Sequence, residues 1–263
     1  MLAVTFHHLD LAPNDAPPDG LAKYIRKPAA GRGSSSARTV APLTSTGGPE
    51  SERRPAPSRP ILGYLFDAAN LLTLAGLLSS TFAMAFAVRG DFAAAAIGLV
   101  LAFVFDGIDG PVSKRISGRT ANDRAFGANL DSLVDMASTG ATLAVVLLAY
   151  GEFGMVYLPG AFALVGATAL RLSYFNVHGL DEGATRYVGM PTDQAIIVFA
   201  AVMLLDVPLG RGAFQVVLYG SAMALAALMV SSLRIPKFTG LVFYALNGAA
   251  IAIATLHAMR LIA

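Results

Sequence analysis

The sequence predicts an all-α polytopic membrane protein, a bundle of about six to seven transmembrane helices preceded by a disordered N-terminal tail. First, hydrophobic residues make up 55% of the 263 residues and charged residues only 14%, against about 25% charged residues in a soluble domain. Second, the mean hydropathy is +0.61. Third, apolar blocks of about 20 residues, the length that crosses a bilayer, recur along most of the chain. Together these observations argue against a soluble enzyme, a disordered regulator or a nucleic-acid-binding module, and they make the lipid bilayer the expected surroundings.

Residues 1–60 are expected to form a separate domain, a disordered, basic, cytoplasmic tail. Pro, Gly and Ser are dense there, apolar periodicity is missing, and 8 Lys and Arg residues outnumber 5 acidic ones. The chain does not open with a basic segment followed by an apolar run, so we expect no secretory signal. Residues 61–263 are expected to form the transmembrane domain. Because the sequence contains no cysteine, disulfides and thiolate metal sites are excluded.

Seven apolar blocks are separated by short charged or Pro- and Gly-containing segments. They cover residues 66–88, 91–112, 127–150, 154–177, 191–209, 213–233 and 239–260, and the pattern supports the last block least as a true span. With a cytoplasmic N-terminus, the cytoplasmic side receives Lys114, Arg115, Arg119, Arg124, Arg171, Arg186, Arg234 and Lys237. The opposite side receives Arg89, Arg211 and Arg260, in agreement with the positive-inside rule. We therefore expect a multi-pass protein of a bacterial cytoplasmic (inner) membrane, with its sizeable loops in the cytoplasm.

Two pairs of aspartates are the most informative feature of the sequence. Asp106 and Asp109 lie three positions apart near the end of the second block, and Asp131 and Asp135 lie four apart near the start of the third. Each spacing places a pair on one helical face, and the short connection makes the two helices antiparallel neighbours. Four carboxylates are therefore expected to converge near the membrane boundary, where acidic residues are costly unless they are paired or bound to metal.

A divalent metal site accounts for these carboxylates. An all-oxygen set suits a hard ion, Mg²⁺ or Mn²⁺, and we expect two ions. Such ions commonly serve phosphate substrates, and Gly107, Gly110 and Gly127 would then let a nucleotide or pyrophosphate approach the helix backbones. The rival interpretation, a divalent metal transporter, predicts acids near mid-membrane and related repeats, and no internal repeat is visible in the sequence.

The same stretch resembles the signature of the CDP-alcohol phosphatidyltransferase family, Asp-x-x-Asp-Gly-x-x-Ala-Arg followed by Gly-x-x-x-Asp-x-x-x-Asp. Its aspartates and glycines are present as Asp106, Asp109, Gly110, Gly127, Asp131 and Asp135. The resemblance implies that the first three aspartates bind metal and that Asp135 contributes to the metal site and acts as the general base. It also implies CDP-diacylglycerol and a small alcohol as substrates and CMP as a product.

The resemblance further implies a set of nucleotide-binding residues. Asn70 and Thr73 are similar to the Asn-x-x-Thr near the start of the family's first helix, and the full set is Asn70, Thr73, Asp106, Gly110, Ser113, Lys114, Arg115 and Gly127. Two features depart from the family pattern. Ser113-Lys114 stands where Ala-Arg is usual, and 12 residues separate Lys114 from Gly127, more than in the family. Lys114 and Arg115 therefore both remain candidates for the diphosphate contact.

The identity of the acceptor alcohol rests on weaker patches of similarity. Residues 170–177, 189–192 and 228–238 resemble the phosphatidylserine synthase branch, which implies L-serine as acceptor. Inositol, inositol phosphate, glycerol 3-phosphate and choline stay open as alternatives. Arg171 and Arg186 flank the cytoplasmic ends of the fourth and fifth blocks, where each is a candidate for binding a carboxylate or phosphate, and where a topology-setting role is equally open. A second copy of the chain, forming a homodimer, is counted among the candidate partners.

Overall fold

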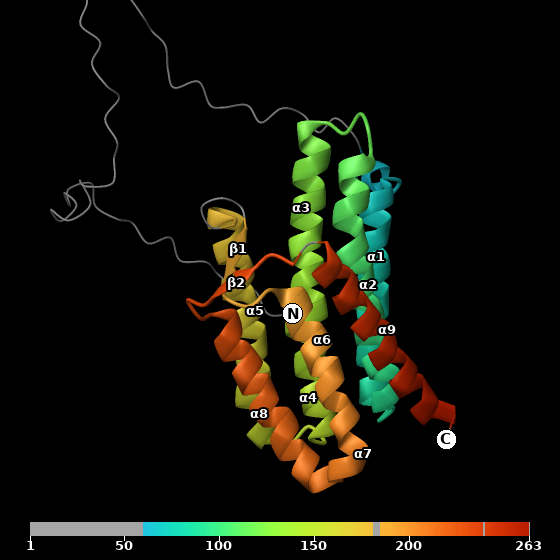
Figure 1. The fold of residues 1–263 in the computed structure, drawn as a ribbon, viewed down its shortest axis with the longest axis vertical. Coiled ribbons are helices and arrows are strands. Elements are labelled where there is room, and N and C mark those ends of the chain that lie inside the picture. Colours follow the sequence, from blue (N-terminus) through green and yellow to red (C-terminus); the bar gives the residue numbers. More distant parts are fainter. Residues whose placement is uncertain (1–59, 181–184, 239, 263) are drawn as a thin grey trace, which may run out of the picture. The chain divides into compact units, whose positions relative to one another are not determined.

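The computed structural model describes residues 60–180, 185–238 and 240–262, so the expected tail lies, apart from Pro60, outside the described residues. The helices are α1 (Ala68–Val88), α2 (Phe92–Arg115), α3 (Ala121–Asp135), α4 (Thr142–Tyr150), α5 (Leu158–His178), α6 (Thr192–Val202), α7 (Asp206–Leu209), α8 (Arg211–Met229) and α9 (Leu241–Ile262), and the strands are β1 (Arg186–Val188) and β2 (Arg234–Pro236) (Figure 1). A π-helical turn, Met136–Ala141, joins α3 to α4, and a 3₁₀ turn, Met203–Leu205, joins α6 to α7. Seven of the described segments are long and apolar enough to cross a membrane, which confirms the predicted class of multi-pass helical membrane protein.

Helices α1 and α2 form a close hairpin. Asp67 and Asp91 begin them, since each side chain accepts a hydrogen bond from a backbone N–H of the first turn, at 3.0 and 3.1 Å. A Cβ on Gly98 would lie 2.9 Å from the Cβ of Ala83, so the two helices pack at backbone distance. Small residues allow this approach in a bilayer, where lipid offers no hydrophobic drive between helices. The hairpin places Thr73 of α1 beside the acidic end of α2.

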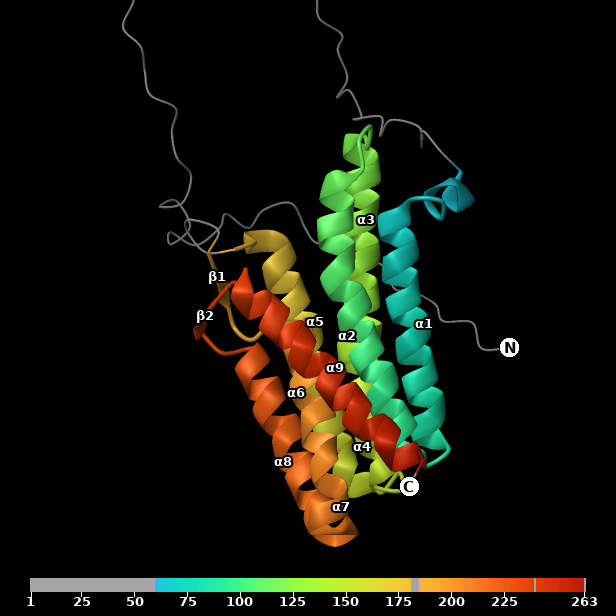
Figure 2. The same ribbon diagram turned by 45° about the vertical axis from the view of Figure 1, so that its right-hand side comes forward.

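Helices α2 and α3 are both longer than predicted. Helix α2 continues through Pro111 to Arg115 rather than ending at residue 112, and α3 begins at Ala121 rather than at residue 127. Thr120 starts α3 with a reciprocal capping box: its hydroxyl accepts from the Asp123 N–H at 3.1 Å, and the Asp123 carboxylate accepts from the Thr120 N–H at 2.9 Å. The extra residues between Lys114 and Gly127 therefore mostly extend helices, which reach beyond the end of α5 in Figures 1 and 2.

A two-stranded antiparallel ribbon, which the sequence did not predict, joins two connections of the chain: β1 lies between α5 and α6, and β2 lies between α8 and α9. Strands β1 and β2 pair with Tyr187 opposite Ile235, and because β2 occupies residues 234–236, helix α8 ends at Met229 rather than at residue 233. Gly189 follows β1 with φ +77°, and a Cβ there would lie 2.3 Å from the Met229 carbonyl oxygen. Only glycine fits this turn, which directs the chain into α6 at Thr192.

Helix α9 is the seventh apolar segment and belongs to the bundle. It lies obliquely across α2 (Figure 2). Near its C-terminal end, His257 Nε2 lies 3.0 Å from the Ala200 carbonyl oxygen, and Arg260 Nη1 donates to the Met203 carbonyl at 3.0 Å. These contacts tie the last segment to α6 and to the turn that follows it.

Candidate active site

Three aspartates from two neighbouring helices meet, and we call them the aspartate trio. A carboxylate oxygen from each of Asp106 of α2 and Asp131 and Asp135 of α3 lies within 4.8 Å of the other two. Within the described ranges, none of the three forms an ion pair with a basic side chain. Carboxylates so close together are costly within a membrane protein unless a cation lies among them. An all-oxygen group of this kind suits a hard divalent ion.

Two hydroxyl groups orient aspartates of the site. Thr73 Oγ1 of α1 donates to Asp109 Oδ2 at 2.7 Å, and Thr192 Oγ1 of α6 donates to Asp135 Oδ2 at 3.0 Å. Asp109 lies outside the trio but lines the same cavity as its three members. The four predicted aspartates therefore gather around one space, with two of them fixed in rotation by neighbouring helices.

That space, which we call the α5–α6 cavity, has a volume of about 220 Å³. Besides the four aspartates, its lining includes Arg171 and Phe175 of α5, Tyr187 of β1, and Thr192 and Asp193 of α6. The structure thus brings Arg171, one of the two arginines considered for the acceptor, against the aspartates. The cavity combines one arginine with five carboxylates.

Arg171 is held firmly in this cavity. Its side chain is buried, its Nε donates to the Met190 carbonyl at 3.2 Å, and its guanidinium carbon lies 5.3 Å from the centre of the Phe175 ring and 5.7 Å from that of Tyr187. Burial, and next the Asp193 carboxylate, raise the pKa of the Tyr187 phenol, which therefore stays protonated at neutral pH. With one hydrogen bond made, the Arg171 guanidinium keeps further N–H donors for a ligand.

A second cavity, the α1–α3 cavity, shares Asp109 and Asp131 with the first and also measures about 220 Å³. Of the predicted nucleotide-binding residues, it is lined by Asn70, Thr73, Gly110, Ser113 and Gly127. A Cβ on Gly110 would meet nothing within 4 Å, whereas one on Gly127 would lie 2.8 Å from Arg119 Nη2 and 3.2 Å from Asn70 Oδ1. Gly110 therefore borders open space, and Gly127 leaves room for two polar side chains.

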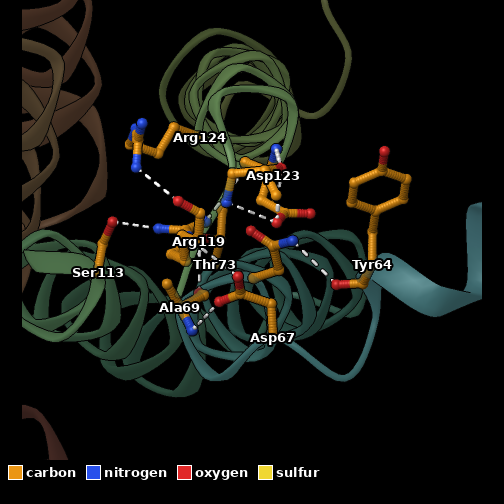
Figure 3. Close-up of polar contacts among 10 residues, drawn as sticks. Tyr64, Asp67, Ala69, Thr73, Ser113, Arg119, Asp123 and Arg124 are labelled. Carbon is orange, nitrogen blue, oxygen red and sulfur yellow. Dashed lines mark hydrogen bonds and ion pairs between the residues drawn. The ribbon is translucent and has the colours of Figure 1, made fainter. Parts of the chain in front are cut away.

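Arg119 is the buried cation of the α1–α3 cavity (Figure 3). Its Nε lies 2.8 Å from Asp67 Oδ2, and the two side chains are only 6% and 8% exposed. It also donates to the Ser113 hydroxyl and, at 3.4 Å, to the Asp123 carbonyl. Arg124, which lines the same cavity, donates to the Arg119 carbonyl at 2.6 Å. The loop before α3 thus brings the Arg119 side chain into contact with residues of the signature.

Three predicted basic site residues do not line these two cavities. Lys114 lines a third cavity, of about 400 Å³, together with Asp106, Gly110, Lys237 and residues of α9. Arg115 is exposed at the last position of α2, and Arg186 is exposed at the first position of β1. None of the three is among the residues that line the α1–α3 or α5–α6 cavity.

The polar and aromatic lining residues that sequence reasoning missed include Arg119, Arg124, Phe175, Tyr187, Thr192 and Asp193. The extra length between Lys114 and Gly127 is the signal that could have pointed to Arg119, because a longer connection leaves room for another cation to reach the cavity. Asp193, at the start of an apolar block, has the same appearance as an ordinary acid in the first turn of a helix. Tyr187 lies in strand β1, which is too short to produce an alternating hydrophobic pattern in the sequence.

The fold and the site define a class of protein, a polytopic helical membrane protein in which half-buried carboxylates suited to a divalent metal line two neighbouring cavities. The family model described as CDP-alcohol phosphatidyltransferase matches residues 66–233. The chain belongs to this family and is a CDP-alcohol phosphatidyltransferase, an enzyme class that generally depends on a divalent metal. The family predicted from the signature is therefore confirmed.

Two curated relatives show what the chain is similar to within the family. It is 28% identical over 182 residues to a CDP-diacylglycerol--serine O-phosphatidyltransferase of Helicobacter pylori, covering 66% of this chain and 73% of that protein. It is also 28% identical over 173 residues to an archaetidylserine synthase of Methanothermobacter thermautotrophicus, covering 65% of this chain and 70% of that protein.

Proposed function

We propose that this enzyme transfers a phosphatidyl group from CDP-diacylglycerol to L-serine, giving phosphatidylserine and CMP. One observation carries the proposal: the α1–α3 and α5–α6 cavities are separate, yet Asp109 and Asp131 line both. Two substrates bound in such cavities would meet at the carboxylates. The names of both relatives, a CDP-diacylglycerol--serine O-phosphatidyltransferase and an archaetidylserine synthase, contain serine, which supports serine as the acceptor.

The α1–α3 cavity is the proposed site of the cytidine diphosphate. It is lined by most of the residues of the signature and by the cations Arg119 and Arg124. A guanidinium held in place by a buried carboxylate, as Arg119 is by Asp67, loses little conformational entropy when it binds a phosphate oxygen. The open space at Gly110 lets the diphosphate approach the backbone of α2.

The residues present fit a divalent metal, because the oxygens of the aspartate trio lie close enough together to share one ion and no basic side chain of the described segments pairs with them. Asp106, Asp131 and Asp135 would hold it, with Asp109 beside them. Mg²⁺ or Mn²⁺ is the proposed ion, and the four carboxylates offer enough oxygen atoms for two. Held by these carboxylates, such an ion would supply positive charge to neutralise the diphosphate and the departing CMP.

The α5–α6 cavity is the proposed acceptor site. Arg171 binds the serine carboxylate, and Asp135 takes the proton of the serine hydroxyl. The hydroxyl oxygen forms a bond to the phosphatidyl phosphorus, the bond from that phosphorus to the bridging oxygen breaks, and CMP leaves with that oxygen. The Thr192 hydroxyl, which donates to Asp135 Oδ2, keeps the carboxylate turned toward the cavity.

The same proposal includes an orientation and a division of the chain. The proposed orientation puts the two cavities on the cytoplasmic side of a bacterial inner membrane, and the excess of Lys and Arg in the segments that follow α2, α5 and α8 supports it. Residues 1–60 form a cytoplasmic tail, and residues 61–263 form the catalytic transmembrane domain. The acyl chains of the donor then enter sideways from the bilayer.

The test is CMP release from CDP-diacylglycerol and Mn²⁺ with each acceptor in turn: L-serine, inositol, inositol phosphate, glycerol 3-phosphate and choline. We expect a clear preference for serine, and preference for another acceptor would overturn the serine assignment while leaving the reaction type. Arg171→Gln should raise the KM for serine and leave the Kd of the donor unchanged, because only acceptor binding is removed. Arg186→Gln, an exposed arginine of the same region, is the matched control and should change neither value.

A further inference from the structure

We propose that Asp193 binds the ammonium group of the acceptor and, with Arg171, makes the α5–α6 cavity selective for a zwitterionic amino acid. The inference rests on the proposed function and names the feature of the acceptor that the site recognises. It concerns a residue that belongs neither to the aspartate trio nor to the family signature.

The first argument is the arrangement of charge. Asp193 and Arg171 line the same cavity, yet no ion pair joins them in the described parts of the chain. Arg171 is buried and Asp193 is half-buried, and opposite charges that lie near each other and largely out of water normally pair, since an unpaired buried charge is expensive. An amino acid carries one group for each of them: its carboxylate matches the guanidinium, and its ammonium matches the carboxylate.

The second argument is that Asp193 is oriented and still has acceptor capacity. Its Oδ1 accepts one hydrogen bond, from the Gln194 N–H at 2.8 Å, in the first turn of α6. A carboxylate has room for about four donors. Gly189 fixes the turn that precedes α6 against the Met229 carbonyl, so the start of this helix, and Asp193 with it, is held in place.

The third argument separates Asp193 from the metal site. The described acidic groups whose oxygens approach closely enough to share an ion are Asp106, Asp131 and Asp135, and Asp193 is not among them. A further carboxylate beside such a cluster raises the repulsion within it. A cationic group on the acceptor compensates for that repulsion.

The arrangement also works against other acceptors. The phosphate of glycerol 3-phosphate or inositol phosphate would face the Asp193 carboxylate, and choline would leave the Arg171 guanidinium buried without an anion. A site that leaves a buried charge unmatched discriminates strongly against such a ligand. Selectivity therefore comes from repulsion and unmatched charge as well as from attraction.

The experiment compares three acceptors that differ by one group: L-serine, 3-hydroxypropanoate, which lacks the ammonium, and ethanolamine, which lacks the carboxylate. Asp193→Asn keeps an oxygen for the Gln194 N–H but removes the charge. It should raise the KM for serine by about 10- to 100-fold, the scale of a charge-assisted hydrogen bond, and leave the KM for 3-hydroxypropanoate unchanged or lower. Arg171→Gln is the mirror variant and should penalise serine but not ethanolamine.

Several outcomes would overturn the inference. An equal rise in KM for serine and 3-hydroxypropanoate would show that Asp193 does not recognise the ammonium. A loss of Mn²⁺ affinity as large as that of Asp131→Asn would assign Asp193 to the metal site instead. If the variant has no measurable turnover, calorimetric titration of L-serine into the CMP-bound protein decides, and an unchanged Kd would refute the inference. Failure of the wild-type enzyme to use serine would instead refute the proposed function.

Discussion

The two ends of the helical bundle differ in whether the acidic residues compared below form ion pairs. At the end that contains α7 and the C-terminus of α9, Asp206 is paired: Arg260 Nη2 lies 3.0 Å from its Oδ2, and the Tyr150 hydroxyl donates to its Oδ1. Glu152 pairs there with Arg211 at 2.6 Å. The aspartate trio lies toward the other end, and among the described residues no basic side chain pairs with it.

This difference separates acids that stabilise the fold from acids that perform chemistry. Removing one partner of an acid–arginine pair leaves the other charge uncompensated and raises the free energy of the folded state. Unpaired carboxylates that repel one another raise that free energy and persist where a ligand compensates for them. Matched substitutions at the two ends should therefore affect different quantities, activity at one end and stability at the other.

The largest effect is expected from the aspartate trio. Asp131→Asn should lower turnover at least about 10³-fold, because several kcal/mol of charge neutralisation depend on the metal, and a chelator should do the same until Mg²⁺ or Mn²⁺ is restored. The metal-free variant should be as stable as the metal-free wild type or more so, since one repelling charge is gone. Asp206→Asn is the control and should keep turnover within about 2-fold, a fraction of 1 kcal/mol. Full activity of a thoroughly chelated sample would contradict the metal assignment.

A smaller effect separates proton transfer from substrate binding. Asp135→Asn should still bind CDP-diacylglycerol but release CMP at least about 10²-fold more slowly, the usual scale for loss of a general base. Donor binding by calorimetry and CMP release from the same preparation provide the two measurements. Near-normal turnover would show that the base is another group, and Thr192→Val, which only frees the Asp135 carboxylate to rotate, should cost much less.

Arg119 of the α1–α3 cavity is an exception to this comparison. It forms an ion pair with Asp67, yet it lies at the end of the bundle that contains the proposed active site. Arg119→Ala should raise the Kd of the donor by about 10- to 100-fold through loss of charge-assisted hydrogen bonds, with the KM for serine unchanged. Lys114→Ala combined with Arg115→Ala is the matched control, since neither residue lines this cavity. If the double variant loses donor affinity and Arg119→Ala keeps it, the diphosphate contacts Lys114 or Arg115 instead.

The sequence predicted the features that depend on local spacing. Residues three or four apart share a helical face, so the meeting of α2 and α3 at their aspartates followed from the chain itself. Hydropathy likewise indicated all seven apolar segments, including α9. Of the other residues that line the α1–α3 cavity, Gly110, Ser113 and Gly127 came from the signature, and Asn70 and Thr73 came from the separate Asn-x-x-Thr of the first helix.

The acceptor side depends on tertiary contacts that spacing does not encode. Arg171 and Asp193 come together only because Gly189 turns the chain between β1 and α6, and the three-residue strands of that ribbon are too short for an alternating pattern. Thr192 gains its role from a hydrogen bond to a residue 57 positions away. The return of Arg119 to the cavity depends on how the extra residues divide between helix and loop, which composition does not determine.

The smallest effect is expected at the paired end. Arg260→Gln removes the partner of Asp206, and because both side chains are 23% exposed, water screens part of the interaction. The loss should be about 1 kcal/mol of unfolding free energy, visible as a lower midpoint of denaturant unfolding in detergent, while the metal affinity, the donor Kd and the KM for serine stay at wild-type values. Arg89→Gln is the control at another end-of-helix arginine, one with no ion pair in the described residues, and should leave the midpoint in place. An Arg260 variant with a wild-type unfolding midpoint but reduced turnover would contradict the distinction between the two ends. It would mean that the Arg260–Asp206 pair, at the end away from the aspartate trio, takes part in catalysis.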